Sequence, residues 1–371
     1  MFFNVFFKNL REELIPRFCQ VDPLFNLLYQ DLYYSGSYYS GLKVGKPDEF
    51  DLNIVLYNEA LMHYVKVERS QPGYVQLRVG MKGFRQDEDR MTGVALAQFE
   101  GLLNGSGKGL RQLNPKAVNQ WFFNVVKKAY GLIPKRVELN SDAAQFRKIK
   151  HFDIEQNGPA LTLMLELTNG HKVDLDLVPV LPFKRRRLRK FGIIFTNVNQ
   201  PNWLRKRTGL PKAYRMKLTD GFNQNFFAIP KPGPSELDWP IHFPFAEKRI
   251  IFDLGCVKPV TRVLKLFRDS NPVLSKVKSY ALVTIVMKMI REDFQFWIQN
   301  QNRPSICFLS ALENLEKAIN SGHLGWFFDE RCNKLPQKDF PPNKCKEIAQ
   351  FLHAAILKMK QNETNWHEYF E

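Results

Sequence analysis

The stretch GSYYSGLKVGKPDEFDLNIVL, residues 36–56, places a glycine-rich loop directly before an acidic and apolar run. Residues 50–57 alternate in polarity and are rich in β-branched side chains, a pattern that predicts a strand. Glu49 and Asp51 lie two positions apart, so in a strand their side chains share one face. Glycine lets a phosphate approach the backbone, and backbone N–H groups with the Ser37 hydroxyl can bind its oxygens. The stretch therefore predicts a phosphate-binding loop that leads into a strand with two carboxylates.

A second acidic strand is predicted within residues 161–180, LTLMLELTNGHKVDLDLVPV. Two alternating apolar runs flank an Asn-Gly dipeptide, which is a strong hairpin signal because both residues tolerate positive φ. In the second run Asp174 and Asp176 share a face. Pro179 is expected to end ladder pairing, because proline has no N–H to donate.

Carboxylates that converge on one side of a sheet repel one another unless a cation lies between them. Mg²⁺ is typically held by a few carboxylates together with substrate phosphates, and two such ions can clamp the attacking and leaving oxygens of a phosphoryl displacement. The acidic strands and the glycine loop thus suggest nucleotidyl transfer. From spacing alone an equally good interpretation makes Glu49 and Asp51 solvated residues of an edge strand, because the ExD pattern is common.

The overall composition indicates a polyanionic partner. The 371 residues carry a net charge of +17, and such an excess is typical of proteins that bind nucleic acid or, second, an anionic membrane surface. The five cysteines are widely spaced and lack a CxxC pair, which predicts free thiols in a reducing, cytoplasmic compartment. No apolar run reaches the ~18 residues of a membrane-spanning helix. Asn4 and Lys8 interrupt the N-terminal apolar run, so we do not expect this segment to be a signal peptide. No membrane partner is expected.

Apolar periodicity predicts the secondary structure along the chain. Phenylalanines at helical spacing predict a long N-terminal helix over residues 1–30, with breaks near Pro16 and Pro23. The segment NGSGKG, residues 104–109, lacks the hydroxyl residue and the first glycine of a P-loop and is interpreted as a flexible loop. The other predicted elements are strands at 50–57 and 74–80, mainly helix over 95–130, and helices at 257–268, 275–297, 305–320 and 342–360. The expected fold class is α+β, with a mixed β-sheet lobe over residues 1–225 and a helical lobe over residues 226–371.

Basic residues gather in two runs and on the first helix. Neutralising a phosphate releases counterions, and A-form RNA is recognised through its shape and backbone, so we expect these residues to line a nucleic-acid groove. A solvated charge run or a nuclear-localisation-like patch is the alternative interpretation. The residues are Lys8, Arg11 and Arg17, then Lys184, Arg185, Arg186, Arg187, Arg189 and Lys190, then Arg205, Lys206 and Arg207.

The motif GSYYSGLKVGKPDEFD resembles the GS-x(n)-ExD signature of nucleotidyltransferases, and in its full form resembles cyclic GMP-AMP synthase-like receptors and male-abnormal-type proteins. The resemblance continues through VDLDLVPV, through FFAIPKP (226–232) and through WPIHFPFAEKRII (239–251), and it reaches Ser279-Tyr280. It thus covers most of the chain, and its first motif is the most specific. It implies a bilobal nucleotidyltransferase fold with an N-terminal spine helix and a helical C-terminal lobe.

The resemblance also implies roles for individual residues. Gly36 and Ser37 match the triphosphate-binding loop, and Glu49 and Asp51 match the first two catalytic metal ligands. The family's D-x-x-P pattern selects Asp176 rather than Asp174 as the third ligand, with Asp174 as its neighbour on the same face. Two ions, Mg²⁺ or Mn²⁺, are the implied cofactors. The implied nucleotide-binding residues are Lys231, Glu247, Ser279, Tyr280 and a basic residue near Thr261 or Arg262, for which Arg262 is the better match.

Vertebrate cyclic GMP-AMP synthase has a zinc-binding insertion between the two lobes, with one histidine and three cysteines, that docks double-stranded DNA. This sequence differs from it there. The segment AEKRIIFDLGCVKPV holds one cysteine, Cys256, and no histidine, so a four-ligand zinc site cannot form there. No zinc is expected, and double-stranded RNA becomes a better candidate activator than DNA. The resemblance implies ATP and GTP as substrates and a cyclic GMP-AMP type product in innate immune sensing. A ligand-induced oligomer fits the same role.

Two further departures concern the nucleotide bases. Pro240 and His242 replace an arginine and a serine of the family, which leaves base choice and linkage open. The alternatives to cyclic dinucleotide synthesis are a non-catalytic nucleic-acid-binding family member and a linear oligoadenylate-type synthase.

Overall fold

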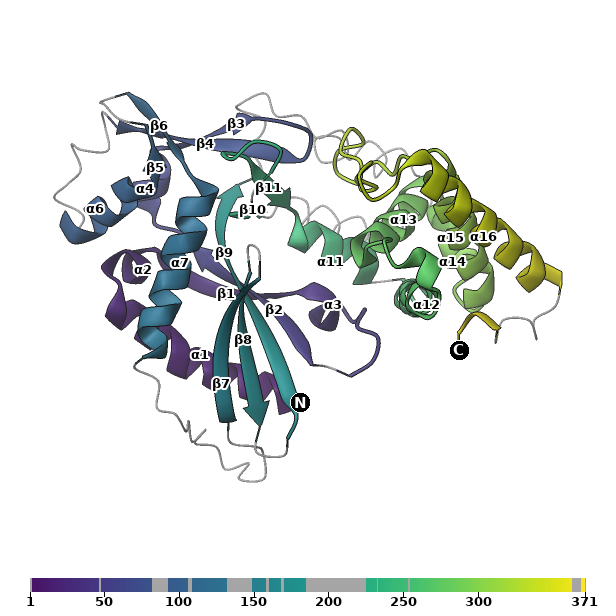
Figure 1. Ribbon diagram of the computed structural model, residues 1–371, viewed down its shortest axis with the longest axis horizontal. Coiled ribbons are helices and arrows are strands. Elements are labelled where there is room, and N and C mark those ends of the chain that lie inside the picture. Colours follow the sequence, from purple (N-terminus) through teal and green to yellow (C-terminus); the bar gives the residue numbers. More distant parts are fainter. Residues whose placement is uncertain are drawn as a thin grey trace. The chain divides into compact units, whose positions relative to one another are not determined.

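The computed structural model of the chain describes residues 2–46, 48–81, 93–105, 109–131, 149–157, 160–167, 170–184, 225–231, 233–252, 254–361 and 368–370. These residues form two compact units (Figure 1). The first contains the described parts of 2–39, 48–184 and 225–242, and the second contains those of 40–46 and 243–370. The first unit carries the β-sheet and the second is helical, which confirms the predicted α+β class.

The described strands of the first unit form one sheet of eleven strands, in the order β1-β2-β9-β10-β11-β4-β6-β5. In addition, β3 pairs with β4, β7 pairs with β8, and β8 pairs with β9. The strands are β1 Tyr29–Ser35, β2 Glu49–Leu56, β3 Val65–Arg69, β4 Tyr74–Gly80, β5 Leu103–Asn104, β6 Leu110–Leu113, β7 Ile149–Asn157, β8 Ala160–Leu167, β9 Lys172–Lys184, β10 Asn225–Ala228 and β11 Trp239–His242.

The β10–β11 hairpin joins two halves of this sheet. β10 pairs with β9 on one side, and β11 pairs with β4 on the other. Trp239 in β11 is fully buried, and its indole N–H donates to the carbonyl of Leu113 at 3.1 Å. Because this hairpin belongs to the sheet, the compact units divide after His242, later than residue 225, where the sequence pattern placed its boundary.

Pairing continues past Pro179, so the prediction that this residue ends the ladder is wrong. Pro179 pairs with Ile54 of β2, and β9 runs on to Lys184. On its other side β9 pairs with β8 only up to Leu177 and with β10 only from Leu181. Pro179 therefore lies between these two paired stretches, where its missing N–H deprives neither strand of a bond.

The described helices of the first unit are α1 Phe2–Val21, α2 Pro23–Leu28, α3 Gly36–Tyr39, α4 Glu59–His63, α6 Gly93–Gly101 and α7 Pro115–Tyr130. Asp22 separates α1 from α2 and is almost fully buried. Its carboxylate accepts hydrogen bonds from the Phe25 backbone at 2.8 Å, the Gln98 amide at 3.0 Å and the Trp121 indole at 3.3 Å. One buried carboxylate thus ties the end of α1 to α2, α6 and α7.

Two helix predictions in this unit need correction. Pro16 lies inside α1, so only the break at Pro23 is confirmed. A proline removes one backbone bond from a helix, and the burial of Ile15 and Phe18 in the core offsets that loss. The prediction of helix over 95–130 holds for α6 and α7, but β5 and β6 form an antiparallel pair between them, because Gly105 takes a positive φ of 92° and the chain reverses.

The second unit consists of α11 Pro244–Phe252, α12 Val257–Ser270, the 3-10 helix η2 Pro272–Leu274, α13 Ser279–Glu292, α14 Phe294–Gln299, α15 Pro304–Asn320 and α16 Pro342–Gln361. The predicted helices at 257–268, 305–320 and 342–360 match α12, α15 and α16. The single helix predicted over 275–297 is wrong, because α13 ends at Glu292. Asp293 then caps α14, since its carboxylate accepts a bond from the Phe296 backbone at 3.0 Å.

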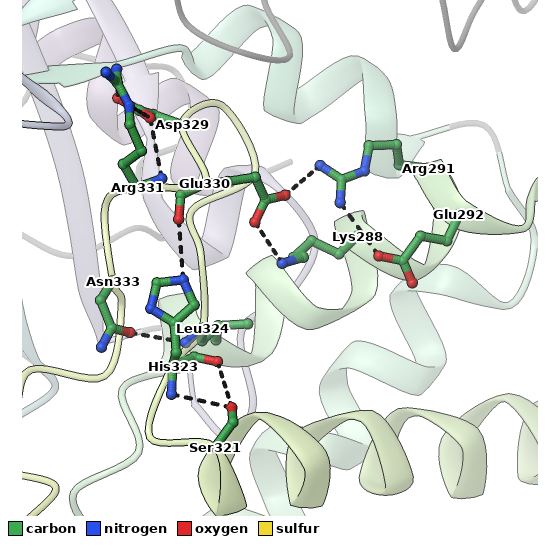
Figure 2. Close-up of polar contacts among 10 residues, drawn as sticks. All are labelled: Lys288, Arg291, Glu292, Ser321, His323, Leu324, Asp329, Glu330, Arg331 and Asn333. Carbon is green, nitrogen blue, oxygen red and sulfur yellow. Dashed lines mark hydrogen bonds and ion pairs between the residues drawn. The ribbon is translucent and has the colours of Figure 1, made fainter.

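The loop between α15 and α16 is fastened to α13 (Figure 2). The Glu330 carboxylate accepts from Lys288 at 2.9 Å and from Arg291 at 2.6 Å. Burial alone would raise the pKa of Glu330, but these two cations outweigh it and lower the pKa. Gly325 packs so closely on Glu330 that a Cβ would overlap its carboxylate. The loop therefore has a charge-paired anchor on a core helix.

No helix among the described residues is both long enough and apolar enough to cross a membrane.

Candidate active site

The two acidic strands predicted from the sequence are neighbours in the sheet. β2 and β9 run parallel, and their register places Glu49 beside Asp174 and Asp51 beside Asp176. Phe50 of β2, between the two acidic residues, is buried, while the four acidic residues are exposed or half-buried. The structure therefore brings four carboxylate side chains to one face of two adjacent strands.

Gly36 lies against one of these carboxylates. It opens α3 with a positive φ of 77°, and a Cβ on this residue would overlap the carboxylate of Asp51. Ser35, the preceding residue, pairs with Asp51 across β1 and β2. Glycine is thus required here for two reasons, its backbone conformation and the space that Asp51 fills. The predicted phosphate-binding loop and the predicted metal ligand are in direct contact.

Asp176 has a hydrogen-bond donor of its own. Thr162 of β8 lies opposite Asp176, and its hydroxyl donates to Asp176 Oδ1 at 2.6 Å. Three of the four carboxylates, those of Glu49, Asp174 and Asp176, line a cleft of about 430 Å³. Its lining residues are Asp48, Glu49, Thr162, Lys172, Asp174 and Asp176.

Burial together with the neighbouring carboxylates raises the pKa of Asp174 above its usual range. Burial is the larger cause, and the nearby carboxylates of Asp176, Asp48, Glu49 and Glu155 add to it. A cation would relieve this repulsion, and oxygen-only ligands suit a hard divalent ion. The donor set therefore fits Mg²⁺ or Mn²⁺. Within the described part of the chain, however, no group of three or more acidic, histidine or cysteine side chains is already arranged as a complete metal site.

The predicted nucleotide-binding residues fall into both units. Lys231 is exposed and follows β10 in the first unit, whereas the other four belong to the second. Arg262 is exposed on α12. Ser279 opens α13, and its hydroxyl accepts a bond from Arg268 at 2.9 Å.

Tyr280 is the centre of a polar cluster in the second unit. Its hydroxyl donates to the Glu247 carboxylate and accepts from the Trp326 indole at 2.8 Å. The Lys334 ammonium lies over the Trp326 ring at 4.4 Å and over the Tyr280 ring at 5.7 Å. Burial, and then the charge of Glu247, raise the pKa of Tyr280 well above its usual range. The hydroxyl therefore stays protonated and the ring is held in one orientation.

Most of the predicted nucleic-acid residues lie outside the described residues. Arg11 of α1 forms an ion pair with Asp31 at 3.0 Å, with both side chains well exposed, and exposed pairs of this kind contribute little to stability. Lys184 is exposed at the end of β9. Lys8 lies in α1, but its side chain is not among those described. The residues outside the description are Arg185, Arg186, Arg187, Arg189, Lys190, Arg205, Lys206 and Arg207.

Sequence reasoning missed three residues of these clusters. Thr162 carried a usable signal, because it is a hydroxyl residue within the apolar run of a predicted strand. Trp326 and Lys334 carried none, because they lie in the irregular loop between α15 and α16, whose path no periodicity reveals.

Comparison with known proteins gives the family. Residues 38–252 match the Mab-21 protein nucleotidyltransferase domain, and residues 256–354 match the Mab-21 protein HhH/H2TH-like domain. The chain is also similar to proteins named cyclic GMP-AMP synthase-like receptor in three insects. Identity is 27% for Aethina tumida, over 90% of this chain and 76% of the relative, 28% for Tribolium castaneum, over 96% and 84%, and 25% for Ctenocephalides felis, over 91% and 75%.

These matches confirm the resemblance that the glycine-serine and ExD motifs suggested, and the chain belongs to the Mab-21 nucleotidyltransferase family.

Proposed function

We propose that this protein joins ATP and GTP into a cyclic GMP-AMP type dinucleotide as a sensor of the innate immune system. The observation that carries the proposal is the register of β2 and β9, which sets Glu49 beside Asp174 and Asp51 beside Asp176. Gly36 touches the same Asp51. A triphosphate-binding loop in contact with a carboxylate pair is the arrangement that nucleotidyl transfer requires.

The candidate site residues of the first unit have separate roles in the proposed reaction. The backbone N–H groups of the Gly36-Ser37 turn and the Ser37 hydroxyl bind the triphosphate of the donor nucleotide. Glu49, Asp51 and Asp176 hold two Mg²⁺ or Mn²⁺ ions. When bound, these ions supply Lewis-acid stabilisation of the attacking ribose hydroxyl and of the pyrophosphate leaving group. The three carboxylates fix the positions of the metal ions, and the Lys231 ammonium adds a positive charge for the phosphates.

The second unit supplies recognition of the bases. Tyr280 offers an aromatic face for stacking, and Glu247 and Trp326 hold its ring in place through its hydroxyl. Ser279 and Arg262 supply polar contacts.

The proposed activator is double-stranded RNA, bound in the cytoplasm. The net charge of +17 supports a polyanionic ligand, and Arg11 and Lys184 are exposed members of the basic set. We propose that activation is independent of zinc and accompanied by oligomerisation on the duplex. A relative's name, cyclic GMP-AMP synthase-like receptor, supports the sensor role.

The test is synthesis by the purified protein from labelled ATP and GTP with duplex RNA, duplex DNA or no nucleic acid. We expect a product that resists phosphatase, as a cyclic dinucleotide does, and that forms with RNA. Phosphatase-sensitive chains would indicate a linear oligoadenylate-type synthase instead. Duplex binding without any product would indicate a non-catalytic family member. The control is Glu49→Ala with Asp51→Ala, which should remain folded and make no product, because exposed and half-buried carboxylates contribute little to packing.

A further inference from the structure

Thr162 is the polar neighbour of Asp176 in the sheet. β8 and β9 run antiparallel, so the two residues are direct cross-strand partners. The Thr162 hydroxyl donates to Asp176 Oδ1 at 2.6 Å. Thr162 is only 6% exposed, so water competes little for this bond, and hydrogen bonds that an ionised group accepts are stronger than neutral ones.

The next carboxylate along β9 lacks this support. Asp174 faces Met164 of β8, and a methionine side chain has no donor. The two aspartates therefore differ in the cross-strand partner that β8 provides, although they share a face and a cleft. This difference is independent of the D-x-x-P spacing that distinguishes them in the sequence.

We propose that Thr162 is a positioning residue for Asp176. Its hydroxyl fixes one carboxylate oxygen, Oδ1, and thereby directs Oδ2 and the remaining lone pair of Oδ1 toward a divalent ion. The inference rests on the proposed function, in which Asp176 is a metal ligand. Partners that orient metal ligands in this way typically change metal affinity or activity about 10- to 100-fold when they are lost.

The test is a titration of the purified protein with Mn²⁺ alone, followed through the electron paramagnetic resonance signal of the free ion. Thr162→Val keeps the side-chain shape and removes the donor, and we expect Mn²⁺ to bind about 10-fold more weakly. Thr162→Ser keeps the hydroxyl and should bind Mn²⁺ as the unchanged protein does. The matched control is Thr284→Val, because Thr284 is also buried and its hydroxyl bonds only a backbone carbonyl, at 2.8 Å.

Asp176→Asn is measured in the same series and separates the two proposals. If Asp176→Asn weakens Mn²⁺ binding and Thr162→Val does not, the positioning role is overturned and the metal assignment stands. If Asp176→Asn leaves Mn²⁺ binding unchanged, the metal assignment fails and the positioning role fails with it.

Thermal unfolding guards against a purely structural explanation. Valine favours strands at least as well as threonine, so Thr162→Val should unfold near the unchanged protein. If Thr162→Val is strongly destabilised, Mn²⁺ binding by Thr162→Ser becomes the deciding measurement. A folded serine variant that binds Mn²⁺ weakly would overturn the proposal.

Discussion

Replacing Gly36 with alanine should inactivate the protein far more than it destabilises it. Gly36 has a φ of 77°, and this left-handed conformation costs a non-glycine residue roughly 1–2 kcal/mol. The added Cβ would also overlap the carboxylate of Asp51. The carboxylate is the end of a side chain and can rotate away, but Asp51 Cβ would lie 2.9 Å from the added carbon and cannot, so the backbone must also shift slightly. Either movement takes the carboxylate out of the position in which it would hold a metal ion.

The magnitudes of the two effects differ. The backbone strain should lower the unfolding temperature by a few degrees. Misplacing a catalytic group by about 1 Å can cost roughly 100-fold in rate, which corresponds to about 2.7 kcal/mol of transition-state stabilisation. We therefore expect Gly36→Ala to lose about 100-fold or more in kcat while it remains folded.

Gly170→Ala is the matched control. Gly170 has nearly the same φ, 78°, but nothing lies within 4 Å of the position that its Cβ would take. Both variants should lose a few degrees of thermal stability through backbone strain, Gly36→Ala somewhat more because of its contact with Asp51 Cβ, and only Gly36→Ala should lose its activity. The assay is initial rate with ATP and GTP at saturating duplex RNA, beside unfolding followed by circular dichroism. Equal activities in the two variants would refute the role of the Gly36–Asp51 contact.

Three further predictions concern other charged groups. Asp176→Asn should reduce the rate of synthesis roughly a thousandfold, as expected for a lost metal ligand, and Asp174→Asn only about 10- to 100-fold. The reverse ranking would show that Asp176 is not the third metal ligand. Changing the three arginines at 185–187 to glutamate should weaken duplex RNA binding for all RNA sequences and flatten the salt dependence of that binding. A zinc chelator should leave RNA-stimulated synthesis intact. Stimulation of synthesis by duplex DNA alone would contradict the assignment of RNA as the activator. Glu330→Gln should lower the unfolding temperature at neutral pH, because the lowered pKa of Glu330 stabilises the fold above about pH 4.3 and that contribution disappears as the pH falls through the folded-state pKa. An equal deficit at acidic pH would show that the ion pairs are not the cause.

The sequence predicted the acidic strands because their signals are local. Alternation fixed which side chains share a face, so the pairing of Glu49 and Asp51 with the β9 aspartates needed only the two strands to be neighbours. The α+β class and the helices α12, α15 and α16 followed from periodicity in the same way, whereas the single helix predicted over 275–297 is divided into α13 and α14. The roles of the site residues remain predictions.

The errors arose where tertiary contacts override a local signal. Pro16 normally breaks a helix, but the buried residues around it keep α1 continuous. Pro179 normally ends a ladder, but it falls between the partners of β9. Thr162, Trp326 and Lys334 gain their importance from neighbours that are distant in sequence, which no window of the chain contains.

The β10–β11 hairpin also has a consequence for synthesis on the ribosome. This hairpin connects β9 to β4 within the sheet, yet residues 225–242 are translated after the other nine described strands of that sheet. Until they emerge, the nascent chain exposes the unpaired edges of β9 and β4, and open strand edges promote aggregation. A fragment that stops near residue 225 should therefore be prone to self-association during expression, whereas one that extends through His242 contains all the strands that close the sheet.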